Sequence, residues 1–330
     1  MLQFFISFVV TSATMVPVLS LLRRLQVVDV PNQRSSHVVV VPRGGGLAMI
    51  AGCTAGVVSA LIAGSALDDV VDGWAVLATC AGMLLLASLG FADDVAHVSA
   101  RIRLALQGTI AAGVATAVAV GSPTPWPVAL VAIFGCLWLV SYVNAFNFMD
   151  GVNAISATSA LLAACWYGAL GAQASDGLVS AAAWSLAGAA LAFLPWNAHR
   201  PKVFLGDVGS YGIGALVGVL ALLTAVREAD LWLALAPLTV YLVDTSGTLL
   251  RRALRGEALM EAHRSHVYQR LLDVGLSHLG STAIVATGGL VVCSATLALH
   301  TAGAILVAAV VAVIYHSLPS LLGRRVRVAS

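Results

Sequence analysis

The stretch VALVAIFGCLWLVSYVNAFNFMDGVNA, residues 128–154, joins a long apolar run to a group of polar side chains. The run is about 20 residues long, the length that a helix needs to cross a hydrocarbon core of ~30 Å. Four polar side chains then recur at every third position: Asn144, Asn147, Asp150 and Asn153. The stretch therefore predicts a membrane-spanning helix that ends in three amides and a carboxylate.

The composition of the whole chain agrees with embedding in a membrane. Of its 330 residues, 60% are hydrophobic and only 10% are charged, and the mean hydropathy is +0.96. A soluble chain does not reach such values. The apolar runs each last about 20 residues, whereas the strands of a membrane barrel would show ~10-residue alternation. An all-α polytopic membrane protein is predicted.

About eleven apolar runs are predicted as transmembrane helices. They lie near 3–21, 45–66, 73–91, 104–121, 128–146, 154–172, 178–196, 209–226, 231–249, 281–299 and 303–320. The first run is long for a signal-peptide core and lacks a basic segment before it, so we expect it to be retained. With no linker and no internal repeat to divide it, the chain is expected to form a single membrane domain over residues 1–330.

The basic residues indicate the orientation, because Lys and Arg accumulate in short cytoplasmic loops. In the alternating loops between the runs, 16 of the 17 basic residues fall on one side and only Arg227 on the other. The basic side holds Arg23, Arg24, Arg34, Arg43, Arg101, Arg103, Arg200, Lys202, Arg251, Arg252, Arg255, Arg264, Arg270, Arg324, Arg325 and Arg327. We therefore expect the N-terminus outside and the C-terminus in the cytoplasm.

Five polar clusters lie on this cytoplasmic side, and the first is VDVPNQRSSHVVVVPRGGGLAM, residues 28–49. It sets Arg34, His37 and Arg43 beside three consecutive glycines. Glycine lets a backbone approach an anion closely, and Arg pairs with phosphate. A basic loop that binds lipid headgroups is an equal alternative.

The second cluster, FADDVAHVSARIR, places Asp93 and Asp94 at the end of the third run. Adjacent carboxylates at a membrane boundary are costly to desolvate, and a metal ion or a cationic substrate is the usual compensation. Neighbours on a helix point about 100° apart, which favours different tasks for the two. His97, four residues after Asp93, would share its face. A solvated helix end is the alternative.

In the third cluster, the opening stretch, amides can read a nucleobase or sugar, and Asp150 can accept from hydroxyls or hold a metal-bound water. Asn in helix packing is the alternative, although it does not account for Asp150.

The fourth cluster, HRPKVFLGDVGSYGIG, sets Asp207 between glycines at a helix start, which favours phosphate and a bridging divalent cation. A simple N-cap by Asp207 or Ser210 competes with this interpretation.

The fifth cluster is RRALRGEALMEAHRSHVYQRL, residues 251–271. Residues 251–262 are predicted as an interfacial helix. His263 and His266 are three apart, which would put both rings on one helical face, with Arg264 between them as a phosphate-binding cation. Two such histidines can bind metal or phosphate. Solvated surface histidines are the alternative.

The five clusters resemble, in order and spacing, motifs of the polyprenyl-phosphate N-acetylhexosamine-1-phosphate transferases. The segments that carry the resemblance are VDVPNQRSSHVVVVPRGGG, FADDV, NAFNFMDGVN, VFLGDVGS and HRSHVYQRL. These transferases form the MraY/WecA superfamily, also called glycosyltransferase family 4. The resemblance spans Val28–Leu271. The forms RSSH…PRGGG and HRSHVYQ look more like the bacterial branch that primes O-antigen or other surface glycans than like MraY, whose triple-His signature is absent here.

The resemblance implies transfer of a sugar 1-phosphate from a UDP-N-acetyl sugar to undecaprenyl phosphate, with Mg²⁺, or Mn²⁺ in its place, as cofactor and UMP as product. It implies a multi-pass protein of the bacterial inner membrane, with its active site on cytoplasmic loops and no nucleic-acid partner. The exact sugar and a homodimer are left open. Whether an Asp acts as general base is also open, because a lipid phosphate is already largely ionised near neutral pH.

By the same resemblance, the catalytic residues are Asp93, Asp94, Asp207, His263 and His266, with Asp207 and Asp94 as metal ligands. The substrate-binding residues are Arg34, His37, Arg43, Asn144, Asn147, Asp150, Asn153 and Arg264. Two positions depart from the family pattern: His97 replaces the last Asp of DDxxD, and Asn153 replaces the second Asp of DGxDG.

Asp244, in the ninth run, matches no motif. Burying an unpaired charge there costs roughly 2.5–3.5 kcal/mol, so a partner or a neutral form is expected. The rival function is a transporter or flippase for an anionic or lipid-phosphate solute. Transporters place ionisable groups near the bilayer midplane on broken helices, whereas the acids of the five clusters lie at the cytoplasmic margin.

Overall fold

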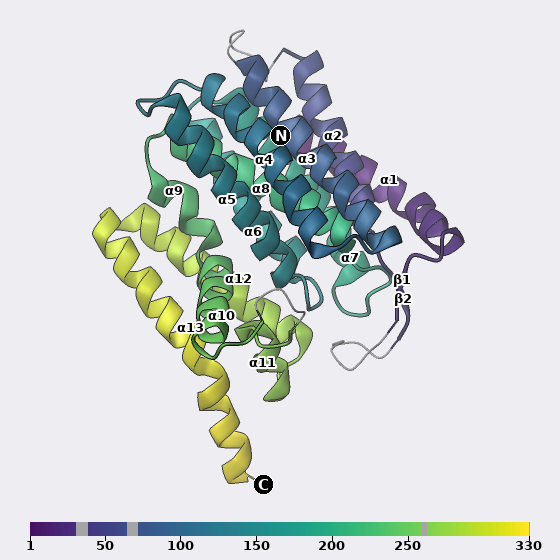
Figure 1. The fold of residues 1–330 in the computed structure, drawn as a ribbon, viewed down its shortest axis with the longest axis vertical. Helices are drawn as coiled ribbons and strands as arrows, with labels where there is room; N and C mark the ends of the chain where they lie inside the picture. The colour runs from purple at the N-terminus through teal and green to yellow at the C-terminus, as the bar shows by residue number, and fades with distance from the viewer. Residues whose placement is uncertain (31–38, 65–71, 259–262, 330) are drawn as a thin grey trace.

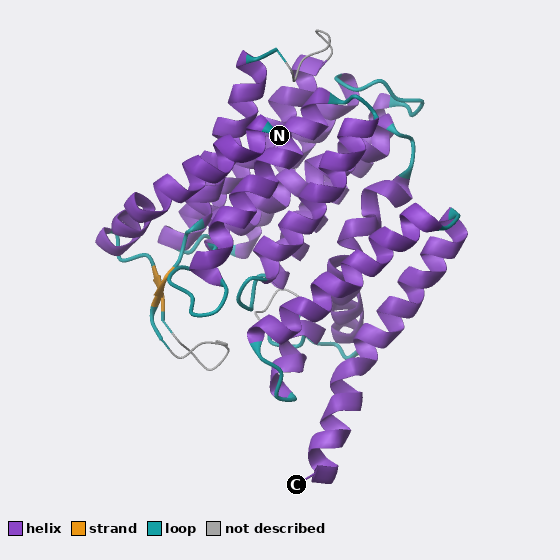
Figure 2. Ribbon diagram, turned by 180° about the vertical axis from the view of Figure 1, so that it is seen from behind, coloured by secondary structure: helices purple, strands orange, loops and turns teal. Residues whose placement is uncertain are grey.

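A computed structural model describes residues 1–30, 39–64, 72–258 and 263–329 of the chain. Arg34 and His37, two of the predicted substrate-binding residues, lie outside these ranges. The described chain is a bundle of helices with one short antiparallel hairpin, β1 (Val28–Asp29) and β2 (Val41–Pro42) (Figure 1, Figure 2). The predicted all-α class is confirmed.

Each of the eleven predicted runs corresponds to helical structure. The helices are α1 Leu2–Arg24, α2 Gly46–Ile62, α3 Asp72–Ala96, α4 Ala100–Val120, α5 Val128–Met149, α6 Ile155–Gln173, α7 Gly177–Asn197, α8 Gly206–Arg227, α9 Leu231–Leu235, the 3₁₀ helix η1 Ala236–Leu238, α10 Thr239–Leu254, α11 Val267–Asp273, α12 His278–Ala298 and α13 Thr301–Ala329. In the described ranges, ten helical segments are long and apolar enough to span a membrane, and α2 is shorter, with 17 residues.

The ninth run is interrupted rather than one regular helix. It consists of α9, η1 and α10, and Pro237 lies in the 3₁₀ turn that joins them. Proline cannot donate a backbone hydrogen bond, which accounts for the local change in helix type.

The predicted interfacial helix over residues 251–262 is wrong in its described part. Arg251 to Leu254 form the last turn of α10, and Gly256, with φ +66°, follows it.

Helix α8 lies at the centre of the bundle, and nearly all of its residues are buried. Its first turn is packed backbone against backbone by glycines of two neighbouring helices. A Cβ added to Gly46 of α2 would lie 2.1 Å from the Cα of Gly209, and one added to Gly90 of α3 would lie 2.1 Å from the carbonyl oxygen of Asp207. Small residues allow such close approach. The end of α3 is therefore held against the start of α8.

The β1–β2 hairpin, the α7–α8 loop and α11 lie at the same end of the bundle in Figure 1. The two termini lie at opposite ends, and the C-terminus extends beyond the end that carries α11 (Figure 1, Figure 2). This arrangement brings polar clusters that are far apart in the sequence to one end of the molecule.

The orientation of the bundle in the membrane stays a prediction, and it follows from the bias of the basic residues. We expect reporter fusions to show the C-terminus in the cytoplasm and the N-terminus outside, because Lys and Arg resist translocation. Fusions to an alkaline phosphatase, active only outside, and to a fluorescent protein, active only inside, measure this. Both termini on one side would contradict the expectation and would distribute the polar clusters over two faces.

Candidate active site

Asp207, in the first turn of α8, is held by side chains from two other segments. Its Oδ1 atom lies 2.6 Å from Nη2 of Arg43, which precedes α2, and accepts a hydrogen bond from Nδ2 of Asn147 on α5 at 2.9 Å. Arg43 also reaches Asp94, with its Nε 2.8 Å from Oδ1 of that carboxylate. Four segments thus contribute one side chain each to a single charged cluster, which we call the Asp207 cluster: Arg43, Asp94, Asn147 and Asp207.

Asp94 caps α8 from another helix. The backbone N–H groups of Asp207 and Val208 donate to its two carboxylate oxygens at 3.0 and 2.9 Å, and its side chain is fully buried. A carboxylate there satisfies free amide groups and complements the helix dipole. The alternative of a cap by Asp207 or Ser210 is therefore wrong, and these two amides are already occupied by protein rather than free for phosphate. The role of Asp94 as a metal ligand stays a prediction.

Asp93 has different partners from Asp94, as the 100° spacing predicts. It forms an ion pair with Arg103 of α4 and accepts a hydrogen bond from the hydroxyl of Tyr211 at 3.4 Å. Its carboxyl also lies within hydrogen-bonding reach of Asp207. The predicted alignment of His97 with Asp93 is wrong, because α3 ends at Ala96 and His97 is exposed with a left-handed backbone, φ +52°.

The Asn-rich end of α5 divides between two environments. The side chain of Asn147 enters the Asp207 cluster, whereas that of Asn144 donates to Gln107 on α4 at 2.7 Å and to the carbonyl of Val140 at 2.8 Å. Asn153 is buried, and its carbonyl accepts from Thr282 of α12 at 2.8 Å. Substrate contacts of Asn144 and Asn153 stay predictions, because the contacts of both residues are to other parts of the protein.

Asp150 follows the last turn of α5, and its carboxyl lies near the hydroxyl of Ser156. Burial raises the pKa of Asp150 to about 7, and the nearby hydroxyl of Ser156 and the charge of Arg43 only partly oppose this rise. The carboxyl can therefore change its protonation state near neutral pH.

The raised pKa of Asp150 predicts that the free energy of unfolding depends on pH. The folded protein holds a proton at Asp150 that the unfolded chain releases above about pH 4, so this residue lowers the stability as pH rises from about 4 to 7. We expect the melting temperature of Asp150→Asn in detergent to change less between pH 5 and 8 than that of the wild type. Glu228→Gln, which removes an exposed acid, serves as the control. Melting curves of wild type and Asp150→Asn that shift in parallel would contradict this assignment.

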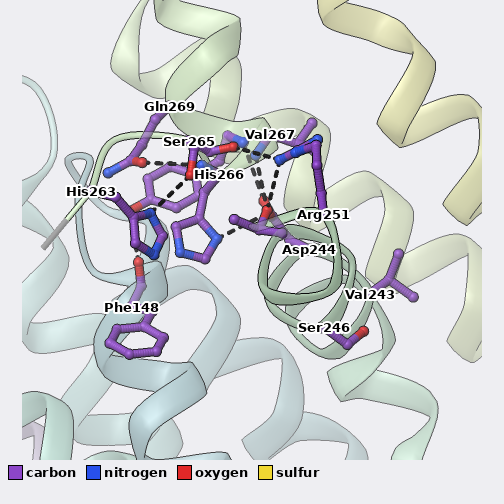
Figure 3. Close-up of polar contacts among 12 residues, drawn as sticks. Phe148, Val243, Asp244, Ser246, Arg251, His263, Ser265, His266, Val267 and Gln269 are labelled. Atoms are coloured by element: carbon purple, nitrogen blue, oxygen red, sulfur yellow. Dashed lines mark hydrogen bonds and ion pairs between the residues drawn. The ribbon is translucent and has the colours of Figure 1, made fainter. Parts of the chain in front are cut away.

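His263 and His266 face each other in a loop rather than along a helix (Figure 3). His266 is the N-cap of α11, and residues 263–265 are not helical, so the predicted shared helical face is wrong. Their ring centroids are nevertheless only 5.0 Å apart. His266 is 2% exposed, which excludes the solvated-surface alternative for it.

The surroundings of this histidine pair keep one ring neutral and hold the loop against α5. Burial, with a contribution from the nearby His266, lowers the pKa of His263 to about 4. His263 Nδ1 lies 3.0 Å from the hydroxyl of Ser265. Arg264 pairs with Asp273 at the end of α11, with 3.3 Å between Nη2 and Oδ1. The hydroxyl of Tyr268 donates to the carbonyl of Phe148 at 2.8 Å, which fixes α11 beside Asn147.

Sequence reasoning assigned no role to Asp244, although the structure places it against the histidine pair. Its Oδ1 lies 3.1 Å from Nδ1 of His266 (Figure 3). The expected partner of this buried acid is thus present. The signal in the sequence was a lone acid within an apolar run, which shows that a partner is needed but not which one.

The residues of the Asp207 cluster suit a magnesium ion. Mg²⁺ keeps several waters and is bound in proteins through one or two carboxylates together with substrate phosphates, so it needs no closed protein cage. Among the described residues, no three carboxylate, imidazole or thiol groups gather as metal ligands. The Asp207 side chain is 13% exposed and lies beside the carboxyl of Asp93, whereas Asp94 is fully enclosed. Asp207 is therefore the most exposed oxygen donor for such an ion, and Asp93 beside it, with a side chain that is 5% exposed, is the second.

Comparison with known proteins finds one matching family and many relatives. The sequence model of Glycosyl transferase family 4 matches residues 76–225. The Bacillus subtilis "Probable undecaprenyl-phosphate N-acetylglucosaminyl 1-phosphate transferase" is 24% identical over 320 residues, covering 92% of this chain and 86% of its own. The Mycolicibacterium smegmatis "Decaprenyl-phosphate N-acetylglucosaminephosphotransferase" is 31% identical, covering 79% and 72%. A Thermotoga maritima "Undecaprenyl-phosphate alpha-N-acetylglucosaminyl 1-phosphate transferase" is 29% identical, covering 55% and 58%.

Proposed function

The chain belongs to glycosyltransferase family 4, and on that premise we propose that it transfers an N-acetylhexosamine 1-phosphate from a UDP-sugar to a polyprenyl phosphate and releases UMP. The relatives named above are transferases of N-acetylglucosamine phosphate with undecaprenyl or decaprenyl phosphate in their names. Undecaprenyl phosphate, a UDP-N-acetyl sugar and the cytoplasmic side of a bacterial inner membrane are the specific forms of this proposal.

The Asp207 cluster is the observation that carries the proposal. Transfer between two phosphates demands neutralisation of charge and alignment of the reacting groups more than covalent participation of the protein. The cluster combines a guanidinium, two carboxylates and an amide from four separate segments at the start of α8. This set can hold phosphate oxygens and, through Asp207 with Asp93 beside it, a divalent cation.

In the proposed reaction, a non-bridging oxygen of the lipid phosphate forms a bond to the β-phosphorus of the UDP-sugar. The bond from that phosphorus to the oxygen shared with the α-phosphate breaks, and UMP leaves with the electron pair. Arg43 is the described guanidinium nearest to Asp207 and can neutralise the diphosphate once the carboxylates take another cation. Asn147 orients the Asp207 carboxylate through its amide.

Mg²⁺, or Mn²⁺ in its place, is part of the proposal as the cofactor. Asp207 and Asp93 would hold it, and when bound it would supply charge neutralisation at the phosphates. Tyr268 holds the His263–His266 pair beside the end of α5, the helix that carries Asn147, and the pair is part of the proposal as a second contact to the donor phosphates. Priming of O-antigen or another surface glycan is the pathway we propose for the product.

The donor specificity gives the first test of this function. Sites that hydrogen-bond a substrate group reject analogues that lack it by factors of about 10⁴–10⁵, whereas apolar pockets discriminate far less. We expect purified protein with undecaprenyl phosphate and Mg²⁺ to release UMP from UDP-linked 2-acetamido sugars, including 6-deoxy forms, but not from UDP-glucose. Uptake of an anionic or lipid-phosphate solute by proteoliposomes without any UMP release would replace this function by transport.

A further inference from the structure

Asp244 is an acidic residue inside a membrane-spanning segment, and it belongs to none of the family-like motifs. Its side chain is fully buried. Five groups of the described chain converge on its two carboxylate oxygens. These are Nδ1 of His266 at 3.1 Å, the N–H groups of Val267 and Tyr268 at 3.0 and 3.2 Å, and the hydroxyls of Thr248 and Tyr315 at 3.2 and 2.7 Å.

This set of contacts determines which nitrogen of His266 carries a proton. An ionised carboxylate only accepts hydrogen bonds, and the four other groups on Asp244 are N–H or O–H donors. The contact to His266 is therefore complete only when Nδ1–H donates to the carboxylate. Nε2, on the other side of the ring, has no hydrogen-bond partner among the described residues and is buried. A buried nitrogen of this kind needs an explanation.

Ring packing alone cannot fix this proton. The imidazole of His266 packs against the rings of His263, at 5.0 Å between centroids, Tyr268, at 5.7 Å, and Phe148, at 6.1 Å. These contacts hold the plane of the ring, yet they do not distinguish Nδ1–H from Nε2–H. Figure 3 shows Asp244 on one side of the ring and the side chains of His263 and Phe148 on the other. The carboxylate selects the tautomer, and it leaves Nε2, on the side of His263 and Phe148, as a buried nitrogen without a partner among the described residues.

We propose that Asp244 is a positioning residue for the transfer reaction: it fixes the Nδ1–H tautomer of His266 and directs Nε2 toward the substrate phosphates. This inference rests on the proposed function. When Nε2 takes a proton from water as the phosphates bind, the carboxylate behind the ring stabilises the imidazolium, and Nε2–H then donates to a phosphate oxygen. A carboxylate behind a functional histidine acts in this way in other enzymes.

A purely structural role would also involve Asp244, because it caps α11 through Val267 and Tyr268 and ties α13 through Tyr315. Loss of stability on mutation therefore cannot separate the two roles. The two carboxylate oxygens offer a matched pair of variants. Asp244→Asn removes the charge that faces His266, whereas Tyr315→Phe removes a strong hydrogen bond to Oδ2 and leaves the His266 contact at Oδ1 in place.

For the positioning role we expect Asp244→Asn to lower kcat by on the order of 10²-fold with KM changed by less than about 3-fold. Tyr315→Phe should lower the melting temperature comparably while kcat stays within about 3-fold of the wild type. His266→Asn keeps a donor in the place of Nδ1 but lacks Nε2. Adding Asp244→Asn to His266→Asn should cost less than about 3-fold more, because residues that act as one unit are not additive. Equal kcat losses in Asp244→Asn and Tyr315→Phe, or additive losses in the double variant, would overturn the proposal.

A readout that does not need turnover separates failure of this inference from failure of the proposed function. In protein labelled with ¹⁵N-histidine, the resonances of His266 are identified by their loss in His266→Asn. They should show protonated Nδ1 in the wild type and in Tyr315→Phe, and a shift toward protonated Nε2 in Asp244→Asn. No UMP release by the wild type would refute the proposed function, while an unchanged tautomer in Asp244→Asn would refute the role of Asp244.

Discussion

Asp207→Asn is expected to lower turnover by on the order of 10³-fold while the protein stays folded and inserted. The substitution keeps the shape of the side chain but removes the negative charge that meets Arg43 and lies beside Asp93. A metal ion stabilises charge in the transition state by several kcal/mol, and about 1.4 kcal/mol corresponds to a factor of ten. UMP release at saturating substrates, together with Mg²⁺ affinity from calorimetry, measures the effect.

Ser210→Ala is the matched control for this variant. Ser210 lies in the same turn of α8 and accepts from the same amide, Nδ2 of Asn147, at 2.8 Å, but carries no charge. Its removal should change turnover by less than about 5-fold, since an uncharged hydrogen bond contributes about 1 kcal/mol. If Asp207→Asn retains more than a tenth of wild-type turnover at limiting Mg²⁺, Asp207 is not the metal ligand.

Arg43→Gln is expected to lower kcat/KM by on the order of 10²-fold, and it should also lower the melting temperature in the absence of Mg²⁺. Arg43 is the cation that joins Asp94 and Asp207, so its removal leaves two neighbouring carboxylates without their shared counter-charge. Breaking such a pair is costly because the remaining charge stays poorly solvated. Arg43→Lys should recover only part of the loss, since a single ammonium cannot form both contacts as the guanidinium does.

A bound Mg²⁺ ion can replace the positive charge that Arg43→Gln removes. The effect of Mg²⁺ on the melting temperature is therefore a second test of this prediction. Mg²⁺ should raise the melting temperature of Arg43→Gln more than that of the wild type, because binding to the folded state stabilises it and the variant lacks the competing Arg43 contact. In the double variant Arg43→Gln/Asp207→Asn this extra stabilisation should disappear. Equal stabilisation of wild type, single variant and double variant by Mg²⁺ would show that the Asp207 cluster does not bind the ion.

The sequence predicted the helices well because their signal is local. A run of about 20 apolar residues is by itself sufficient to predict a helix that spans the lipid bilayer. The structure has helical segments at all eleven predicted positions. Gly206 and Asp207 were also identified correctly as the start of a helix. Interruptions were less visible, and η1 between α9 and α10 was missed because Pro237 can be tolerated in a membrane helix when neighbours satisfy the backbone.

The candidate site was predictable as a collection of residue types at one end of the bundle, since alternating loops of a helical membrane protein gather on one side. Asp93, Asp94, Arg43, Asn147 and Asp207 indeed meet there. Their pairings were not predictable. The cap of α8 by Asp94 joins residues 113 positions apart, and it depends on how closely Gly90 lets α3 approach α8. No periodicity encodes such a contact.

Asp244 marks the boundary between the two kinds of information. Its sequence position alone determines that a charge lies within an apolar segment and needs compensation, because desolvation of a lone carboxylate is costly wherever the chain folds. Only the tertiary structure decides that the compensation comes from His266, the start of α11 and Tyr315 on α13, 71 residues away. Hydrophobic length and loop charge act along the chain, whereas hydrogen-bond geometry is set by packing between helices that are distant in sequence.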